Sequence, residues 1–412
     1  MKIVIAGAGI GGLTTALLLH ERGIECEIYE KVPELLQIGV GLALLPHAVR
    51  VYDSLRLLPE LDKIGMRTEM SYFRTRHGQN VWEERRGIPA GYDVPQYAIH
   101  RAHLQQVLVD AVNSRLPDGS LHLDASFEKV SQTDSGITAL FRRSDNSTVT
   151  VEGDALIGAD GIHSAVRHQF HPDEGAPRWS GLTLWRGAVE WPSFMDGKSY
   201  INSGGTDCKF VLYPISAGKT PETQLMNWAT VIRKADPGGA PPAREEWNRQ
   251  AGLADIQKLL KAFTIPELDF EAMVAATPIF WEFPICDRDT LQKWSFGRTT
   301  LLGDAAHSMY PFGANGAAQS ILDGQKLADE LAKGGAIADA LIRYEADRLP
   351  KTNEIVANNR NGGPERVVNE VELRSPKRFD DVEKVLSYED RKAIVHGYAE
   401  LAGYAKEQMA RS

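Results

Sequence analysis

The sequence predicts an α/β protein in which a domain with a parallel sheet is joined to a second domain with a mostly antiparallel sheet. Two observations predict the first domain: a strand, a glycine-rich turn, a helix and a strand open the chain, and an apolar strand ending in Gly303-Asp304 returns much later. A third observation predicts the second domain, because strand-like runs rich in aromatic residues alternate with turns between residues 181 and 284. We expect the charged segment 361–412 to form a C-terminal helical tail.

The chain opens with a short apolar run, residues 3–6, whose composition is typical of a strand buried on both faces. The run ends in Gly7-x-Gly9-x-x-Gly12, after which apolar residues recur at helical spacing and a second strand follows at 25–29. This order indicates a dinucleotide site in a Rossmann-type domain, and it is more specific than the glycine pattern alone.

Each glycine of this turn has a physical role. Gly7 permits the tight turn, Gly9 lets the backbone approach a pyrophosphate, and Gly12 lets the helix and the strand pack closely. The helix N-terminus presents unpaired N–H groups to the phosphates, and Glu30 can accept hydrogen bonds from a ribose. These features suit NAD and FAD equally. The residues predicted to contact the nucleotide at this end are Gly7, Gly9, Ile10, Gly11, Gly12, Glu30 and Lys31.

Composition narrows the class of protein. The 412 residues are enough for two or three closely packed domains with a large core. The net charge of −9, with no block of like charge, disfavours nucleic acid and anionic membranes as partners. No apolar run has the length of a membrane span, and the N-terminus lacks a secretion signal. The three cysteines have no paired spacing, which favours free thiols in the cytoplasm, and no metal site is predicted.

The middle of the first domain is a mixture of loops, helices and short strands. A stretch at 37–47 carries two glycines between apolar residues, which suggests a backbone that passes close to a flat group. We expect a helix near 48–57, strands within 69–86, and a strand end that runs into a helix at 97–114. Residues 120–156 are predicted to form a meander of short strands.

In the second half of the chain, a strand-like residue pattern is followed by a helical one. The strand-like runs are 182–190, 209–214, 224–231 and 273–281, with a helix predicted at 254–263 and helical structure from 317 to about 360. The predicted units are a dinucleotide-binding domain of 1–70, 98–180 and 285–360, a substrate-binding sheet domain of 71–97 and 181–284, and the tail 361–412.

A second ligand-binding position is predicted at Gly303-Asp304, which follows a buried strand. In doubly wound sheets ligands bind at the carboxyl ends of the strands, and Asp304 can accept hydrogen bonds from hydroxyl groups there. The loop 311–319 opens a long helix whose free N–H groups would face an anion. A dehydrogenase that binds only NAD does not need this distant site, whereas FAD has a ribityl chain and a ring that gains negative charge when it is reduced.

Three motifs together resemble those of the FAD-dependent aromatic hydroxylases, the single-component group A flavoprotein monooxygenases. They are Gly7-x-Gly9-x-x-Gly12, Gly158-x-Asp160-Gly161 and Gly303-Asp304-Ala305-Ala306-His307, and the resemblance extends over residues 1–350. Within this group the chain is most similar to phenazine-hydroxylase-like and salicylate-hydroxylase-like enzymes. The stretches that carry this closer resemblance are 39–41, 95–101, 184–187 and 309–317.

The resemblance implies a fold, an activity and cofactors. The fold is a glutathione-reductase-like, Rossmann-type FAD-binding domain with an antiparallel substrate domain. The activity is hydroxylation of an aromatic or N-heteroaromatic substrate with NAD(P)H and O2, through a C4a-hydroperoxyflavin. FAD would be tightly bound, and NADH or NADPH would bind only transiently, because the chain has no second Gly-x-Gly-x-x-Gly.

The resemblance also implies roles for individual residues. Glu30 would hold the adenosine ribose, Arg101 the pyrophosphate or ribityl region, and Asp304 the ribityl chain, while Asp160 would help position the pyrophosphate. Taken alone, Asp160-Gly161 is better explained as an ordinary turn, and the alternative for Arg101 is a surface ion-pair residue. The further residues implied to lie near the flavin are Val40, Gly41, Leu42, Gln105, Gly316 and Ala317.

The substrate pocket is predicted from side-chain type alone, and most aromatic residues are simply part of a core. Arg186 would meet a substrate carboxylate, although a structural ion pair explains an arginine there equally well. We assign no catalytic acid, base or nucleophile. The candidate substrate residues are Tyr72, Trp185, Arg186, Tyr213, Trp228, Pro311 and Phe312.

Two other classes of function remain open from the sequence. One is a flavoprotein oxidase or reductase of the same fold, and the other is an NAD-dependent dehydrogenase or a dinucleotide sensor without turnover. The predicted partners are a small aromatic substrate and O2. The sequence leaves the oligomeric state and the choice between NADH and NADPH open.

Overall fold

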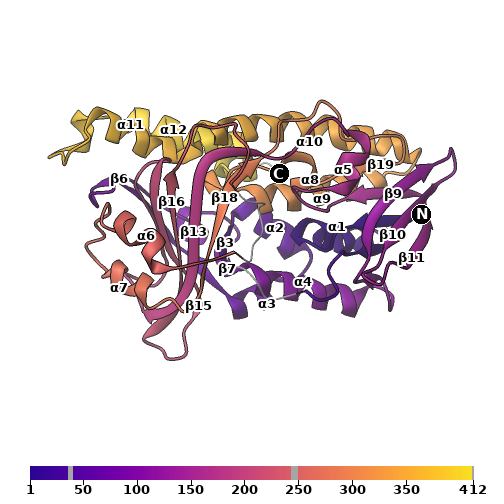
Figure 1. The fold of residues 1–412 in the computed structure, drawn as a ribbon, viewed down its shortest axis with the longest axis horizontal. Helices are drawn as coiled ribbons and strands as arrows, with labels where there is room; N and C mark the ends of the chain where they lie inside the picture. The colour runs from indigo at the N-terminus through magenta and orange to yellow at the C-terminus, as the bar shows by residue number, and fades with distance from the viewer. Residues whose placement is uncertain (36–39, 243–248, 411–412) are drawn as a thin grey trace.

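The computed structural model describes residues 1–35, 40–242 and 249–410, so Gly39 of the predicted loop and the last two residues of the tail lie outside it. Its first domain, on the right in Figure 1, contains a five-stranded sheet in the order β19-β12-β1-β2-β8, and every neighbouring pair is parallel. The strands are β1 (Lys2–Ala6), β2 (Glu25–Tyr29), β8 (Leu121–His122), β12 (Ala155–Gly158) and β19 (Thr299–Leu301).

Strand register brings the predicted motifs together at one edge of this sheet. Ala6 lies beside Gly158, and Gly158 lies beside Leu301, so the chain leaves three adjacent strands at the same level. The turns that follow carry the glycine-rich motif, Asp160 and Asp304. Because the carboxyl ends of parallel strands share an edge, segments about 150 residues apart in sequence become neighbours there.

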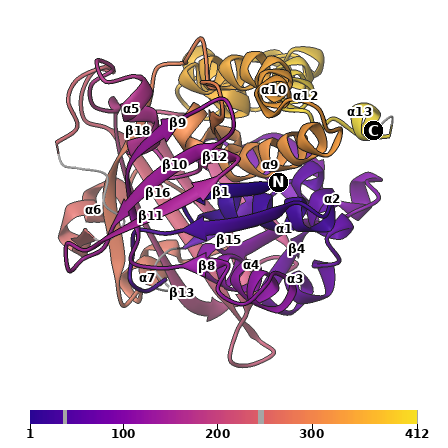
Figure 2. The ribbon, with the colours of Figure 1, turned by 90° about the vertical axis from the view of Figure 1, so that its right-hand side faces the viewer.

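Helices cover the parallel sheet. Helix α1 (Ile10–Glu21) packs against α4 (Arg101–Arg115) and α9 (Gly316–Ala332), and its apolar residues from Leu13 to Leu19 are buried. A three-stranded antiparallel sheet stands at the outer end of the domain, near the N-terminus (Figure 2). Its strands are β9 (Ser126–Gln132), β10 (Ile137–Arg142) and β11 (Thr148–Gly153), which form the predicted meander.

The second domain is built on an eight-stranded sheet in the order β17-β18-β13-β16-β15-β14-β5-β6. Every neighbouring pair in it is antiparallel except β14 with β5. Its strands are β5 (Met70–Arg74), β6 (Asn80–Arg85), β13 (Arg178–Pro192), β14 (Ser199–Ser203), β15 (Cys208–Ala217), β16 (Thr223–Arg233), β17 (Gln250–Ala251) and β18 (Phe280–Asp287). The predicted fold class, a parallel-sheet domain joined to a mostly antiparallel one, is confirmed.

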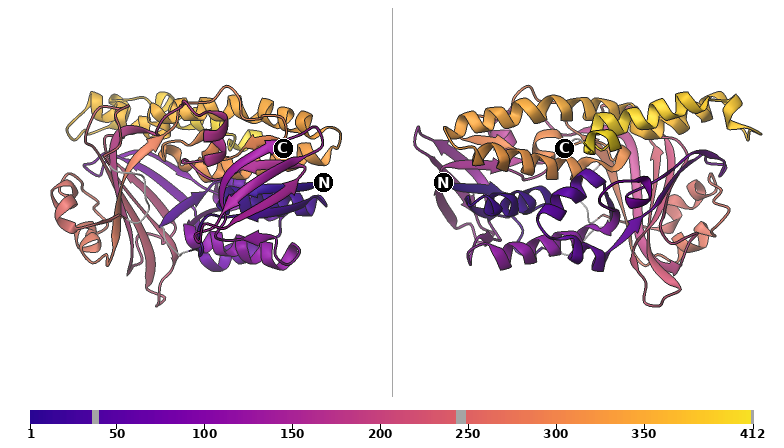
Figure 3. Two further views of the ribbon diagram at one scale, coloured as in Figure 1. Left: turned by 45° about the vertical axis from the view of Figure 1, so that its right-hand side comes forward. Right: turned by 180° about the vertical axis from the view of Figure 1, so that it is seen from behind.

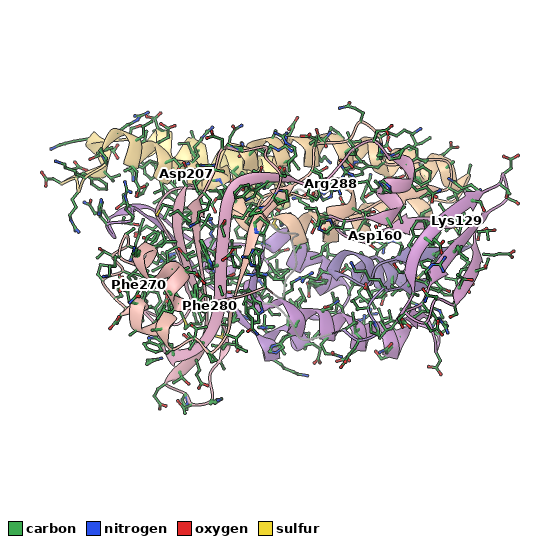
Figure 4. The ribbon with its side chains drawn as sticks, viewed as in Figure 1. Lys129, Asp160, Asp207, Phe270, Phe280 and Arg288 are labelled. Carbon is green, nitrogen blue, oxygen red and sulfur yellow. The ribbon has the colours of Figure 1, made fainter. Side chains whose placement is uncertain are left out.

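The two faces of the large sheet have different neighbours. One face is covered by α6 (Leu253–Leu260) and α7 (Phe270–Ala275), and the other is turned toward the first domain (Figure 1). Figure 4 labels Phe270 on α7, on the side of the sheet away from the first domain. A small antiparallel sheet in the order β3-β7-β4 lies between the domains, and two short helices connect β3 to β4 in the chain. These elements are β3 (Gly41–Leu44), β4 (Gly65–Thr68), β7 (Gln96–His100), α2 (Pro46–Ser54) and α3 (Leu58–Ile64).

Two sequence predictions need correction. Residues 273–281 are not a single strand, because α7 occupies 270–275 and β18 begins only at Phe280. The side chain of Asp269 caps α7 by accepting a hydrogen bond from the Ala272 N–H, and helical spacing buries Phe270, Met273 and Val274 together. The predicted helix 317–360 is two helices, α9 and α10 (Ile337–Arg360). They separate at Gly334 and Gly335, whose φ angles of 74° and 85° lie in the left-handed region.

The C-terminal segment is helical, as predicted, and runs along both domains beside α10 (Figure 3). Its elements are η3 (Gly363–Glu365), α11 (Arg366–Arg374), α12 (Tyr388–Ala402) and α13 (Lys406–Met409). Tyr398 on α12 is fully buried, and its hydroxyl donates to the Phe312 carbonyl oxygen at 3.3 Å. Among the described residues, no helix combines the length and apolar character that crossing a bilayer requires.

Candidate active site

A cavity of about 420 Å³ lies between the carboxyl edge of the parallel sheet and the inner face of the large sheet. Gly9 and Gly11 line it at the glycine-rich turn, and Asp304 and Gly316 line it farther along the same edge. Arg186 projects into it from β13 of the second domain. One continuous cavity therefore connects the turns that precede α1, α8 (Asp304–His307) and α9 with the antiparallel sheet.

The three glycines of the first turn have different surroundings. A Cβ at Gly7, whose φ is +110°, would lie 2.4 Å from the Ala159 carbonyl oxygen, and one at Gly12 would lie 2.1 Å from the Gly7 carbonyl oxygen. A Cβ at Gly9 would meet no atom within 4 Å. Gly7 and Gly12 are therefore required by packing, whereas Gly9 borders open space in front of the N-terminus of α1.

Glu30 and Gln105 both hold the backbone of this turn at Ala8. The Glu30 carboxylate accepts hydrogen bonds from the N–H groups of Ala8, at 2.8 Å, and Val32, at 3.2 Å. The Gln105 amide on α4 donates to the Ala8 carbonyl oxygen at 2.8 Å. Lys31 is exposed and is not among the residues that line the cavity.

Asp160 lies behind the cavity wall rather than in it. Its carboxylate accepts hydrogen bonds from the Ser164 hydroxyl and from the N–H groups of Ala165 and Val166, at the start of α5 (Ala165–Phe170). Burial raises the pKa of Asp160, although these hydrogen bonds act to lower it. Its neighbours Ala159 and Gly161 line the cavity, so Asp160 shapes the turn that faces any bound group (Figure 4).

Arg101 and Asp304 line the cavity, and their charges interact. Burial lowers the pKa of Arg101, and the Asp304 carboxylate opposes this effect. The Arg101 N–H also donates to the Val40 carbonyl oxygen at 3.0 Å, which ties α4 to the segment before β3. Gly41 and Leu42 line the cavity, while Val40 is buried behind them. A Cβ at Gly41 would lie within 2.9 Å of three side chains of the large sheet, so a glycine there lets β3 contact that sheet.

A buried ionic cluster supports the Gly303-Asp304 turn from behind. Asp323 on α9 is fully buried and accepts hydrogen bonds from the Gly303 N–H at 3.0 Å, from Arg348 Nε at 2.7 Å, and from the His307 ring. Burial raises the pKa of Asp323, but His307 and Arg348 outweigh it and hold the value at about 2. No local sequence pattern marks this cluster, because His307 and Arg348 are 16 and 25 residues from Asp323.

Asp323→Asn is expected to lower the free energy of unfolding by about 3 kcal/mol, because it leaves the buried Arg348 guanidinium without its counter-charge. The pKa of Asp323 is lower in the folded protein than its ordinary value of 3.8. Its contribution is therefore present above about pH 4 and is lost as the pH falls toward 2. Denaturant unfolding at several pH values should show the wild type and the variant converging below pH 4.

Asp347→Asn is a matched control, because Asp347 forms an exposed ion pair with Lys351 on the same bundle of helices. Its effect on stability should stay below about 0.5 kcal/mol. If both substitutions change stability equally, the buried cluster does not support the fold.

The seven candidate substrate residues divide into two groups. Arg186, Tyr213 and Pro311 line the main cavity. The other four candidates are aromatic residues that are not among its lining residues: Tyr72, Trp185, Trp228 and Phe312.

Strand alternation explains where the three strand residues among these four lie. Trp185 and Trp228 belong to the core beneath α6 and α7, where Trp228 Nε1 donates to the Thr277 hydroxyl at 2.8 Å. Tyr72 packs against the same core. Phe312 packs with Tyr310, and both line a separate cavity of about 240 Å³.

Sequence reasoning missed several lining residues, and alternation along the strand of Tyr213 would have found two of them, Lys209 and Val211. Side chains of one strand point alternately to opposite faces, so Tyr213 shares its face with residues two and four positions away. The missed side chains of the large sheet include Tyr200, Lys209, Val211, Asn227 and Phe283.

The inner face of the large sheet combines aromatic rings with positive charge. Tyr200 and Tyr213 stack with their ring centroids 4.5 Å apart, and the Arg186 guanidinium lies 4.8 Å from the centroid of Phe283. Burial lowers the pKa of Arg186, and the charge of Arg101 lowers it further. This end of the cavity therefore favours an aromatic molecule that carries negative charge.

A model of the FAD binding domain matches residues 1–187 and 265–359. The chain is 40% identical over 365 residues to a phenazine 1,6-dicarboxylic acid hydroxylase of Lysobacter antibioticus, covering 87% of this chain and 89% of that protein. It is 31% identical to a 3-amino-4-hydroxybenzoate 2-monooxygenase of Streptomyces cremeus, covering 86% and 85%. Its fold is similar to that of Klebsiella pneumoniae HpxO solved with FAD and uric acid, at a TM-score of 0.77 and 23% identity over 99% and 98% of the two chains.

Proposed function

The chain belongs to the FAD-dependent flavoprotein monooxygenases, and on this premise we propose that it hydroxylates an aromatic or N-heteroaromatic carboxylic acid with NAD(P)H and O2. The observation that carries the substrate class is the presence of Arg186 beside aromatic rings in the same cavity as Gly9 and Asp304. The two relatives named above act, by their names, on aromatic carboxylic acids, which supports the same class.

The residues along the cavity fit FAD in both shape and chemistry. The open space at Gly9 and the N-terminus of α1 would receive the pyrophosphate, with Glu30 near the adenosine ribose. Arg101 and Asp304 would hold the ribityl region. The N–H groups at the start of α9, at Gly316 and Ala317, would face the ring. When bound, FAD takes two electrons from NAD(P)H and uses them to activate O2 for transfer of one oxygen atom to the substrate.

The chain's own residues would bind, orient and shield the substrate. Arg186 would bind the carboxylate, and Tyr213 would fix the plane of the ring. Leu184, Val211 and Phe283 would exclude water from the reacting end of the cavity. These roles need no dedicated acid or base.

The proposal is tested by NAD(P)H oxidation with a panel of aromatic acids and their matched amides. We expect at least one acid to stimulate oxidation, with one atom of ¹⁸O₂ incorporated into the product, and its amide to stimulate far less. Stimulation without oxygen incorporation would indicate an oxidase or a reductase of the same fold. Equal stimulation by acids and amides would remove the carboxylate from the substrate class.

Asp304→Ala is expected to raise the dissociation constant of FAD about 10- to 100-fold, because a hydrogen-bonded charged group contributes about 1.5–3 kcal/mol. Titration of the apoprotein, followed by flavin fluorescence, measures this change. Asp329→Ala is the control. Asp329 lies in the C-terminal half of α9 and forms a partly exposed ion pair with Arg22. Equal loss of FAD affinity in both variants would argue against a contact between Asp304 and FAD.

A further inference from the structure

A buried ion pair lies beside the part of the cavity where the substrate is proposed to bind. Lys209 Nζ on β15 lies 3.0 Å from Glu365 Oε1, and each side chain is only 5% exposed. Glu365 belongs to η3, in the C-terminal segment, and its carboxylate also accepts a hydrogen bond from the Gly313 N–H at 3.0 Å. The C-terminal segment therefore supplies a negative charge to the sheet that faces the substrate.

Lys209 belongs to the lining of the cavity, but its ammonium group is held toward the wall. It shares its strand face with Val211 and Tyr213, both of which line the cavity. Its Nζ lies 4.7 Å from the centroid of the Phe312 ring, and neither Phe312 nor Glu365 lines the main cavity. Glu365 thus neutralises a cation that would otherwise be available to a ligand at this end.

Carboxylates interact with two of the cationic side chains of the cavity. The described residues that line it include three cationic side chains, Arg101, Arg186 and Lys209. The charge of Arg101 interacts with Asp304, and that of Lys209 is balanced by Glu365. A carboxylate brought to Lys209 would have to displace Glu365, and the displaced carboxylate would remain buried without its partner.

We propose that Glu365 is a specificity-determining residue that restricts the substrate to one carboxylate, bound at Arg186, by holding the Lys209 ammonium out of the cavity. This inference rests on the proposed function, because it takes the first carboxylate to bind at Arg186. It sets this chain apart from the Lysobacter antibioticus relative, whose name gives a dicarboxylic acid as its substrate. Glu365 acts through Lys209, so it is a positioning residue rather than a catalytic one. The Lys209–Glu365 pair thus determines the charge of the cavity wall next to the part of the substrate that lies away from Arg186.

The test compares 2-naphthoate with naphthalene-2,6-dicarboxylate, which differ only in a second carboxylate. Binding to the FAD-loaded protein is measured by the change in flavin absorbance. The wild type should bind the monoacid at least 30-fold more tightly than the diacid. Glu365→Gln keeps an acceptor for the Gly313 N–H but removes the charge, so diacid affinity should rise about tenfold while monoacid affinity changes less than threefold.

Two further variants decide between specificity and a structural role. Glu345→Gln is the matched control, because its carboxylate also accepts backbone N–H groups, those of Trp294 and Ser295, at residues outside the cavity lining. It should leave the preference unchanged. The double variant Lys209→Met/Glu365→Gln removes both charges and should reject the diacid as the wild type does. This double variant also tests the proposal if Glu365→Gln alone fails to retain FAD.

The proposal is overturned if Glu365→Gln weakens both acids equally or leaves the preference unchanged, or if the double variant binds the diacid more tightly than the wild type. The proposed function fails separately, through Arg186. If Glu365→Gln gains diacid affinity while Arg186→Met leaves monoacid affinity intact, the carboxylate does not bind at Arg186. If only the Arg186 variant has its expected effect, the role of Glu365 alone is wrong.

Discussion

Gly9→Val is expected to reduce FAD affinity more than 100-fold while leaving the apoprotein folded. The backbone at Gly9 has φ −71° and ψ 178°, which any residue adopts, and a Cβ there meets no atom within 4 Å. The fold therefore tolerates a side chain at this position. The same side chain would stand in the cavity in front of α1, where the pyrophosphate is proposed to bind. FAD titration and thermal unfolding of the apoprotein measure the two effects separately.

Gly12→Ala is the matched variant, and its main effect is expected on the stability of the apoprotein. A Cβ at Gly12 would lie 2.1 Å from the Gly7 carbonyl oxygen, so α1 would have to move away from the strand. We expect the apoprotein to lose about 2–3 kcal/mol of stability, in the range of other overpacked sites. If Gly9→Val binds FAD normally, the cavity in front of α1 is not the cofactor site.

Arg186→Met is expected to raise the dissociation constant of the aromatic acid about 100-fold, which corresponds to about 2.7 kcal/mol. Methionine keeps apolar bulk in the cavity but removes the charge, so the effect should be confined to ligands that carry a carboxylate. The amide of the same compound should bind equally well to both proteins. In turnover, KM for the acid should rise, and flavin reduction by NAD(P)H without substrate should be unchanged.

Arg178→Met is the control on the same strand. Arg178 is exposed at the start of β13, pairs with Asp289, and is not among the residues lining the main cavity. Its replacement should change acid affinity less than about twofold, since an exposed pair contributes little. If the two variants weaken acid binding equally, the effect comes from overall charge and not from a contact.

Prediction from sequence was most successful where structure is decided locally. The strand, glycine-rich turn and helix at residues 3–21 are as predicted, because buried strands, turns and helices have distinct residue patterns over a few positions. The meander between β8 and β12 is also as predicted. The strand predicted at 273–281 was wrong because a short apolar run suits a buried helix as well as a strand.

The candidate site was predicted unevenly for a physical reason. Gly9, Asp304 and Gly316 were singled out because each follows a recognisable strand or opens a helix, and all three line the cavity. Lys209 and Glu365 were missed because their pairing joins residues 156 positions apart. No local pattern marks an ion pair of that separation.

The amino-acid sequence by itself determined the opening strand, turn and helix, the meander, and the identity of the turns at the edge of the parallel sheet. Only the tertiary structure decided which side of the large sheet faces that edge. Trp185 and Arg186 are adjacent in the chain and point to opposite faces, and the packing of α6 and α7 over one face leaves the other for the cavity. Alternation along a strand fixes two sets of side chains, but contacts distant in sequence choose which set meets the substrate.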